Sequence, residues 1–531
     1  MSRWGMTIDL NRCVGCQTCS IACKQANDTP KGVLWRRVID VEYGSFPNVE
    51  RLFVVTGCQH CENPPCVPVC PTGATQRRQD GLVTIDYDRC IGCASCVVAC
   101  PYQARTISQK NEPYFGSQET LPEQRWPQEE RIGVATKCTF CMDRIDNGLA
   151  KGLTPGIDMD ATPACAATCI AQAIQFGDLD NPNSPVSKLI ENNNNFQMHA
   201  ELGTNPRVRY LYEIPDSMPG REVPSGDLND EWLSDPGNPL VGKPQTFWDY
   251  RAAANFALGG LATGLTIIAW FAFVLGELDA ITLGVVNMTA AAIMAVGLFF
   301  VFLKLGRKLR FLYVLLRPQS SWMTRETYCV ALFYPAVAAG LIWQHPALYA
   351  LSAAAAAGFL ICQARILHAS KGIPAWRAPL VPWMMIFSGL FEGLGLYSVF
   401  IFPVDSFTLF PGWIPIVAIC LALINIGLWL AYQATGKTRG IQPLSLSRIG
   451  VLLPLVVGGG LLLPVGLFVL APFVPVCGLL AGILAVAGGV VWKFALVTWI
   501  CHQQGFALAK VPQRGSGSKA APVRLESPVA G

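Results

Sequence analysis

Apolar and polar positions divide the chain into two parts of different character. From Ala253 onward the sequence contains long apolar runs, and about 20 such residues in a helix span the hydrocarbon core of a membrane. We count eight runs long enough to do so, at residues 253–275, 281–304, 327–344, 347–366, 379–402, 412–433, 450–471 and 474–500. Residues 1–250 are instead rich in charged residues, proline and cysteine. The pattern therefore predicts a polar N-terminal part followed by a bundle of eight transmembrane helices.

Composition supports this division and excludes two classes of protein. Charged residues make up 14% of the 531 residues and hydrophobic residues 52%, which rules out a disordered chain and argues against a wholly soluble one. The net charge of +4 gives no reason to expect a nucleic-acid partner. We predict four segments: a cysteine-rich domain at 1–180, an extended connecting and docking segment at 181–250, a membrane anchor at 251–502 and a flexible tail at 503–531.

The loops between the apolar runs differ in charge on the two sides of the membrane. Those on the side of the N-terminal domain carry twelve Lys or Arg residues: Lys304, Arg307, Lys308, Arg310, Arg317, Arg325, Arg365, Lys371, Arg377, Lys437, Arg439 and Arg448. The opposite loops carry none and show Glu277, Asp279 and Asp405. Because positive loops stay inside, we expect a multi-pass inner-membrane protein with its cysteine domain and C-terminus in the cytoplasm. Residues 1–10 contain neither a signal-peptide apolar run nor paired arginines.

The N-terminal part contains an internal repeat. Residues 7–16 are echoed by residues 84–93, and both copies continue as Cys-x2-Cys-x2-Cys-x3-Cys. Each copy predicts a short strand that enters a cysteine loop and is followed by a short helix. A duplicated module is the simplest account of this similarity.

Sixteen of the 21 cysteines lie in four groups of four, and the other five are scattered through the apolar part. Group one is Cys13, Cys16, Cys19 and Cys23; group two is Cys58, Cys61, Cys66 and Cys70; group three is Cys90, Cys93, Cys96 and Cys100; group four is Cys138, Cys141, Cys165 and Cys169. We interpret the scattered five as small buried residues of helices: Cys329, Cys362, Cys420, Cys477 and Cys501.

The spacing of groups one and three is that of bacterial ferredoxins. A tight loop of this spacing wraps three thiolates around one face of a [4Fe–4S] cube, and the fourth cysteine ligates the partner cluster. Gly15 and Gly92 let backbone amides turn towards the sulfurs. Zinc is the alternative, but four-cysteine zinc sites usually use two Cys-x2-Cys pairs without a third cysteine two residues on. Sixteen thiolates thus allow four [4Fe–4S] clusters with no ligand left over.

The four-group pattern resembles the electron-transfer subunit of molybdopterin oxidoreductases, the family of dimethyl sulfoxide, nitrate, formate and polysulfide enzymes. The resemblance covers residues 5–215 and includes Cys-Pro after groups two and three and the stretches at residues 136–144, 176–179 and 201–204. It implies a ferredoxin-like α+β fold in which group one pairs with group four and group two with group three. The ligand sets that it implies are Cys13, Cys16, Cys19 and Cys169; Cys23, Cys138, Cys141 and Cys165; Cys70, Cys90, Cys93 and Cys96; and Cys58, Cys61, Cys66 and Cys100.

The apolar part resembles the membrane anchor of the same enzymes, through short stretches at residues 305–307, 321–326, 388–390 and 492–494. In most relatives the two parts are separate chains, whereas here they are fused. The sequence leaves no length for a molybdopterin domain, so the resemblance implies a separate catalytic subunit that holds the molybdenum or tungsten centre.

Histidines that could clamp a haem at mid-depth are lacking, because the five of the chain, His60, His199, His345, His368 and His502, lie in the soluble part or near helix ends. We therefore expect no haem and direct electron exchange with a membrane quinone. Ionisable residues inside apolar helices are costly and hence candidates for the quinone site. They are Lys493, Glu392, Arg325, Glu326 and His502. Each also has a structural alternative: Lys493 could snorkel to the inner surface and Glu392 could form a buried hydrogen bond to another helix. Arg325 and Glu326 could be an interfacial anchor or ion pair, and His502 could simply be exposed.

The resulting hypothesis is a fused iron–sulfur and anchor subunit that relays electrons between a catalytic subunit and the quinone pool. The direction of flow is open, since a cytoplasmic site suits oxidation of sulfite or phenylacetyl-CoA, and reduction of a sulfoxide or polysulfide is also compatible. Two alternatives are a redox-linked proton-translocating membrane module and a ferredoxin hub on an inert anchor. The inert anchor predicts that Lys493→Ala leaves quinone reduction unchanged.

Overall fold

The computed structural model describes residues 2–46, 48–110, 112–125, 129–212, 233–402 and 410–506. It divides the chain into two compact units. The first comprises Met1–Pro68, Gly73–Lys243 and the segment that begins at Gln504, and the second comprises Val69–Thr72 and Pro244–Gln503. The predicted tail from residue 507 onward and residues 213–232 of the predicted connecting segment lie outside the described residues.

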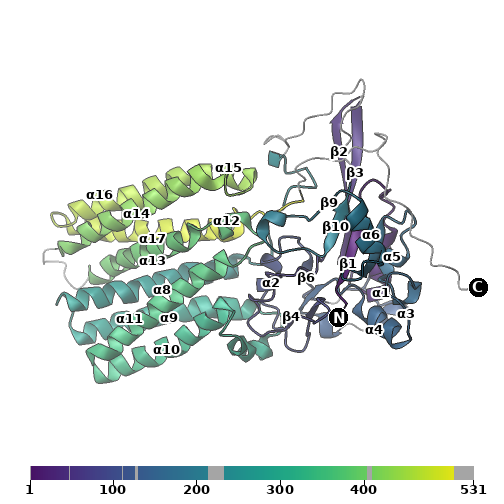
Figure 1. Ribbon diagram of the computed structural model, residues 1–531. Coiled ribbons are helices and arrows are strands. Elements are labelled where there is room, and N and C mark those ends of the chain that lie inside the picture. The colour runs from purple at the N-terminus through teal and green to yellow at the C-terminus, as the bar shows by residue number, and fades with distance from the viewer. Residues whose placement is uncertain are drawn as a thin grey trace, which may run out of the picture. The chain divides into compact units, whose positions relative to one another are not determined.

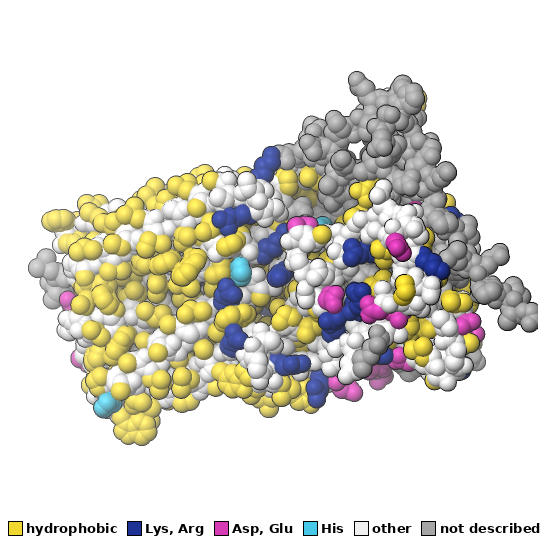
Figure 2. Space-filling model, viewed as in Figure 1, with side chains coloured by type: hydrophobic (Ala, Val, Ile, Leu, Met, Phe, Trp, Pro, Cys, Tyr) yellow, Lys and Arg dark blue, Asp and Glu magenta, His cyan; other side chains and the backbone are white. Residues whose placement is uncertain are grey.

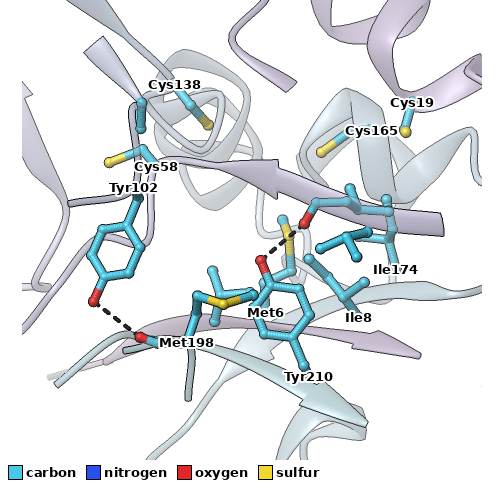
Figure 3. Packing of buried hydrophobic residues seen from close by; sticks show 14 of the residues in the cluster. Met6, Ile8, Cys19, Cys58, Tyr102, Cys138, Cys165, Ile174, Met198 and Tyr210 are labelled. Atoms are coloured by element: carbon cyan, nitrogen blue, oxygen red, sulfur yellow. Dashed lines mark hydrogen bonds between the residues drawn. The ribbon is translucent and has the colours of Figure 1, made fainter. Parts of the chain in front are cut away.

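The first unit is built on a four-stranded sheet in the order β8-β1-β10-β9. Its central strand β1 (Trp4–Asp9) is buried along its whole length, which agrees with its mainly apolar sequence. β1 pairs in parallel with β10 (Val208–Leu211) and antiparallel with β8 (Ile174–Asp178), and β10 pairs antiparallel with β9 (Asn195–Phe196). Figure 3 shows Met6, Ile8, Ile174 and Tyr210 packed together in the core of this unit.

The predicted repeat is present as a structural duplication. The cysteine loop of group one leads into α1 (Thr18–Asn27) and that of group three into α2 (Ser95–Val98). Both helices begin after a residue in the left-handed conformation, Gln17 at φ 63° and Ala94 at φ 65°. An antiparallel hairpin follows each helix: β2–β3 (Arg36–Ser45, Asn48–Gly57) leads to group two, and β6–β7 (Arg105–Ile107, Ala135–Lys137) leads to group four. Between them lies a third hairpin, β4–β5 (Thr75–Arg77, Val83–Ile85).

The structure differs from the predicted boundary at residue 180. The stretch from 185 to 211 forms α6 (Pro185–Asn192), β9 and β10, and β10 lies beside the central strand β1. The sequence did not predict these elements for two reasons. The stretch is rich in Asn, Pro and Gly, and strands of only two and four residues are too short to show a pattern of their own. The remaining short helices of this unit are α3 (Leu121–Arg125), η1 (Glu129–Arg131), α4 (Met142–Ala150), η2 (Met159–Ala161), α5 (Ala164–Ala167) and η3 (Ala200–Leu202).

The chain after residue 503 also differs from the predicted tail at its start. Gln504–Phe506 pack within the first unit, where Phe506 is buried and its amide donates to Leu240 O at 2.7 Å. Gly505 lies so close to this stretch of chain that a Cβ on it would stand 2.2 Å from Leu240 O. The last three described residues are therefore fixed by packing.

The second unit confirms the prediction of eight membrane-length helices. Within the described residues, eight helical segments are long and apolar enough to cross a membrane. They are α8 (Tyr250–Val274), α9 (Ala280–Lys304), α10 (Trp322–Trp343), α11 (Pro346–His368), α13 (Val381–Ile401), α14 (Trp413–Gly436), the continuous segment α15–η5–α16 (Pro443–Leu453, Pro454–Leu462, Leu463–Leu470) and α17 (Pro475–Thr498). Two short helices, η4 (Lys308–Leu316) and α12 (Pro374–Arg377), lie in the loops.

The long helices run side by side in alternating directions (Figure 1). The loops after α9, α11 and α14 therefore lie at the same end of the bundle as the start of α8. On the visible face the helices are covered by apolar side chains, and Lys and Arg gather towards one end (Figure 2). An apolar belt with charges at its end is the surface expected of a bundle surrounded by lipid.

Glycines allow several of these helices to pack backbone against backbone. A Cβ on Gly393 of α13 would lie 2.0 Å from the carbonyl carbon of Gly264 on α8, and one on Gly488 would lie 2.5 Å from Gly460 Cα. Small residues at such crossings are typical of membrane helices, where close van der Waals packing drives association.

We predict that Gly393→Ala lowers the thermal stability of the purified protein, because the added methyl group forces α8 and α13 apart. Overpacking of this kind costs about 1–3 kcal/mol. Gly427→Ala on α14 is the matched control, since a Cβ there meets no atom within 4 Å. Equal melting temperatures of the two variants in the same detergent would contradict the close helix crossing.

Candidate functional site

All sixteen grouped cysteines are free thiols, and twelve of them are buried. Among the described residues, no three His, Cys, Asp or Glu side chains converge closely enough to hold a single metal ion. A cubane cluster does not need such convergence, because its four thiolates bind different iron atoms at separate corners. The relevant question is which four sulfurs surround a common space.

One set of four surrounds a cavity. Cys13, Cys16, Cys19 and Cys169 line a space of about 330 Å³ that is partly open to solvent, together with the apolar side chains of Val38, Val55 and Ile174. Gly15 in the loop has φ +69°, and a Cβ there would lie 2.4 Å from the Phe53 ring. These four cysteines are one of the ligand sets implied by the family resemblance.

A second set gathers around Cys23. Burial raises the pKa of Cys23, and the thiolates of Cys138, Cys165 and Cys141 raise it further because like charges repel. The Asn27 amide lies 3.7 Å from both Cys23 Sγ and Cys141 Sγ. Cys23 of group one therefore lies near cysteines of group four, as the implied ligand set requires.

A third set gathers around Cys61. Burial raises its pKa well above the usual value, with added repulsion from Cys58, Cys66 and Cys100. Group two and the last cysteine of group three are therefore neighbours. The assignment of the sixteen cysteines to four ligand sets remains a prediction, including the set of Cys70, Cys90, Cys93 and Cys96.

The two repeat copies also share a hydroxyl beside the second cysteine. Cys16 Sγ lies 3.4 Å from Thr18 Oγ1, and Cys93 Sγ lies 3.4 Å from Ser95 Oγ. Once the sulfur is a thiolate, the hydroxyl is the donor. Hydrogen bonds to cluster sulfurs help to set cluster potentials.

The donor set fits iron–sulfur clusters on two counts. Buried thiols with raised pKa values stay protonated near neutral pH unless a metal ion supplies compensating positive charge. In addition, the fully buried guanidinium of Arg36 has no hydrogen-bond partner at Nε or Nη1 among the described residues, and buried polar groups are normally paired. An anionic cluster beside it would be its missing partner.

His60 links two of the cysteine groups. The Val83 amide donates to His60 Nδ1 at 3.0 Å, so Nε2 carries the hydrogen and donates to Cys138 O at 3.1 Å. Burial and the neighbouring Lys137 lower the pKa of His60 well below its usual value, which keeps it neutral. Its ring stacks on Phe140 at 3.9 Å, as expected for a packing role.

In the membrane unit the structure brings two candidate residues together. Lys493 Nζ lies 2.7 Å from Glu392 Oε1 and 2.8 Å from Oε2, and both side chains are fully buried. Lys493 therefore does not snorkel to the surface. Glu392 stands in the middle of α13, and a Cβ on Gly260 of α8 would lie 2.2 Å from Lys493 Nζ, so the pair is enclosed by three helices.

A small cavity adjoins this ion pair. Its walls include Phe391, Glu392, Asn425, Trp429 and Trp492, and its empty space of about 250 Å³ is partly open to the outside and leaves room for roughly one water molecule. Trp492 Nε1 is buried and has no hydrogen-bond partner among the described residues. One wall is formed by Val456 and Gly460 of η5, a stretch of π-helix, and such widened turns are frequent at functional sites. Asn425 and Trp492 were missed from the sequence because single polar atoms in apolar runs carry little signal.

A second polar cluster lies near the helix ends on the Lys- and Arg-rich side. Gln363 Nε2 on α11 donates to Asn255 O on α8 at 3.1 Å, and Glu326 on α10 is buried nearby. Asn255 Oδ1, Gln363 Oε1 and Glu326 Oε1 have no hydrogen-bond partners among the described residues. Only Glu326 of these three was identified from the sequence.

Arg325 and His502 have structural partners. Arg325 donates to Pro318 O at 2.8 Å and Gln319 O at 2.7 Å and lies over the Trp322 ring, so it anchors the preceding loop. His502 is buried rather than exposed, with Nδ1 3.0 Å from Ser445 Oγ. Burial and the charge of Arg448 lower the pKa of His502 to about 4, so it is neutral at physiological pH.

The fold and the cysteine geometry define the class: an iron–sulfur protein of the ferredoxin type whose chain continues into a bundle of membrane-length helices. Residues 49–115 match a family described as a 4Fe-4S dicluster domain. The chain belongs to the family of iron–sulfur subunits of dimethyl sulfoxide reductase-type complexes, here fused to the anchor part.

Three relatives illustrate the match. A Halobacterium salinarum protein, provisionally described as the iron–sulfur subunit of a dimethyl sulfoxide reductase, is 40% identical over 44% of this chain and 86% of its own length. A subunit of the selenate reductase of Mesobacillus selenatarsenatis is 41% identical over 39% of this chain and 72% of its own. A subunit of the sulfite dehydrogenase of Allochromatium vinosum is 37% identical over 40% and 83%. These matches concern the N-terminal region.

Proposed function

We propose that the chain is the electron-transfer and membrane-anchor subunit of a quinone-linked oxidoreductase, in which four [4Fe–4S] clusters relay single electrons between a separate molybdopterin catalytic subunit and membrane quinone. The observation that carries this proposal is the closeness of cysteines from distant groups, as at the cavity lined by Cys13, Cys16, Cys19 and Cys169. The side chains around the grouped cysteines bury most of them and supply hydrogen bonds and positive charge. The relatives are themselves named as subunits of reductases or a dehydrogenase, which supports a catalytic partner.

The proposed location is the inner membrane, with the cysteine unit and the C-terminus on the cytoplasmic side. The support is the charge of the loops, since the twelve Lys and Arg residues counted above fall on one side of the helices. The charge of the loops indicates only on which side of the membrane each end of a helix lies. It is compatible with electron flow in either direction.

We propose the cavity beside Glu392 as the site of the quinone ring, which enters when the walls of this small cavity move apart. Phe391, Trp429 and Trp492 offer flat apolar walls, and the unpaired Trp492 N–H can donate to a quinone carbonyl. Reduction of a quinone consumes two electrons and two protons, and the Glu392–Lys493 pair can hold or release protons at the ring. With quinone as the electron partner, no haem is needed.

The polar cluster of Asn255, Glu326 and Gln363 is the competing position. Its three unpaired oxygens are acceptors, which suit the hydroxyl groups of a quinol. Arg325 and His502, which have partners of their own, are assigned to packing around the helix ends.

A test of the relay combines metal analysis with quinone turnover. Anaerobically purified protein is expected to contain about sixteen irons, as four cubane clusters require. Dithionite-reduced protein should be reoxidised by a short-chain quinone, and Glu392→Gln should slow that reoxidation at least tenfold without loss of iron. The exposed Glu277→Gln variant is the control. Zinc in place of iron would overturn the cluster assignment, and slowing in Glu326→Gln alone would move the quinone to the other cluster.

The buried ion pair also favours a second candidate, a module that couples quinone chemistry to proton transfer across the membrane. Glu392 lies in the middle of α13 and Lys493 in the last third of α17, and a buried charge pair in apolar helices of this length is costly unless it has a function. Net proton movement in sealed vesicles during quinone turnover would support this candidate. Proton uptake limited to the quinone stoichiometry would favour a plain anchor.

A further inference from the structure

Arg36, the first residue of β2, is fully buried beside the cysteines. Its Nη2 lies 3.2 Å from Met6 Sδ and 3.8 Å from Cys165 Sγ. The cysteines on which its positive charge acts are Cys165, Cys138, Cys19 and Cys23. The charge of Arg36 is thus held among three members of one implied ligand set and one member of another.

Arg105, the first residue of β6, is placed in the same way in the other half of the unit. It is buried, and its Nη2 donates to Cys66 Sγ at 3.0 Å while Nη1 donates to Thr75 Oγ1 at 3.2 Å. The cysteines on which its positive charge acts are Cys66, Cys96, Cys58 and Cys100. Three of these cysteines belong to one implied set and Cys96 to another.

The two arginines are equivalent under the internal duplication. Cys96 and Cys100 lie 77 residues after Cys19 and Cys23, which is the repeat offset. Both arginines start the first strand of the hairpin that follows, Arg36 opposite Gly57 and Arg105 opposite Lys137. The residue after Gly57 and the residue after Lys137 are each the first cysteine of a group, Cys58 and Cys138. The duplication therefore includes one buried cation for each half as well as the sulfurs.

The residues opposite the arginines break this symmetry. A Cβ on Gly57 would lie 3.1 Å from Arg36 Nη1, so the glycine leaves room for the guanidinium. Lys137 in the equivalent place is buried, and its ammonium group donates to Val83 O and Cys138 O. The two halves therefore differ at this position, with a buried ammonium group beside Cys138 O in one and room for the Arg36 guanidinium in the other.

We infer that Arg36 and Arg105 are charge-setting residues that raise the reduction potentials of the clusters they border. Arg36 acts on the cluster of Cys23, Cys138, Cys141 and Cys165, and Arg105 on that of Cys58, Cys61, Cys66 and Cys100. Adding an electron makes an anionic cluster more negative, and a fixed cation in a low-dielectric interior stabilises that form. The inference rests on the proposed cluster sets.

The test is a potentiometric titration of the whole chain, followed by EPR. Arg36→Gln should make the reduction equilibrium of one cluster at least tenfold less favourable. For one electron this corresponds to a midpoint potential that is lower by about 59 mV. Arg105→Gln should lower that of a different cluster by a similar amount. Arg36→Lys and Arg105→Lys keep the charge and should return each potential most of the way to the wild-type value. Arg51→Gln, an exposed arginine of the β2–β3 hairpin, is the matched control and should shift neither.

Each outcome of this test decides a different point. Unshifted potentials in Arg36→Gln and Arg105→Gln with full iron content would overturn the inference and leave the relay intact. Loss of one cluster in a Gln variant but not in its Lys variant would support the role of the charge at that cluster. Loss of all clusters in both Gln and Lys variants would show a purely structural role and overturn it. Wild-type protein without iron would remove the proposed function itself.

Discussion

Replacement of Cys23 or Cys138 by serine is expected to remove the same cluster, although the two residues belong to groups one and four. The Asn27 amide lies 3.7 Å from both Cys23 Sγ and Cys141 Sγ, and the charges of Cys138, Cys141 and Cys165 act to raise the pKa of Cys23, which agrees with one shared cluster. Each variant should lose up to about four of sixteen irons and one EPR signal, because one cube holds four irons. Electron flow from a reductant to quinone should fall to the background rate in both.

The comparison with Cys19→Ser makes this prediction specific. Cys19 is next to Cys23 in group one, but it lies with Cys13 and Cys169 on the wall of a different cavity. The Cys19→Ser variant should therefore abolish an EPR signal that the Cys23→Ser and Cys138→Ser variants retain. Cys420→Ser on the exposed side of α14 should keep all the iron. If Cys19→Ser and Cys23→Ser removed the same signal, the pairing of groups one and four would be wrong.

The sequence predicted those features of the fold that depend on a pattern of neighbouring residues. Ferredoxin spacing depends on a single loop and one helical turn, and the repeat at an offset of 77 residues marks two copies of it. The eight apolar segments are equally local, because the thickness of the hydrocarbon core sets their length. Both features are present in the structure.

The features that the sequence did not predict depend on contacts between segments that are far apart along the chain. β10 pairs with β1 across about 200 residues, and such a short strand has no clear pattern of its own. Arg36 and Arg105 look like ordinary strand residues in the sequence, and only the structure shows that both are buried with a cysteine sulfur close to the guanidinium group. Glu392 and Lys493 were each recognised as costly, but no spacing rule connects residues on α13 and α17.

The two kinds of site follow the same electrostatic rule. In the first unit, buried cations face buried thiols, and in the second a buried carboxylate faces a buried ammonium group. Both arrangements place charge in a low-dielectric interior, where it is stable only with its partner present. In the first unit the partner is the proposed cluster, whereas in the second it is supplied by the chain itself.

Lys493→Met is therefore expected to destabilise the helical unit strongly, by about 3–5 kcal/mol, because it leaves the Glu392 carboxylate buried without its partner. Glu392→Leu should cost a similar amount by isolating the ammonium group. The double variant should recover most of the loss, since an apolar replacement of a whole buried ion pair is often neutral or stabilising. Thermal unfolding of the four proteins in one detergent gives the coupling between the two residues.

The double variant also separates stability from function. If the pair serves the quinone, this protein should melt near the wild-type temperature, hold its full iron content and still fail to pass electrons to quinone. A double variant that is stable and reoxidised at the wild-type rate would show that the ion pair is a packing element and the helices an inert anchor. A double variant whose loss of stability equals the sum of the two single losses would contradict the direct contact between Glu392 and Lys493, because residues in contact do not act independently.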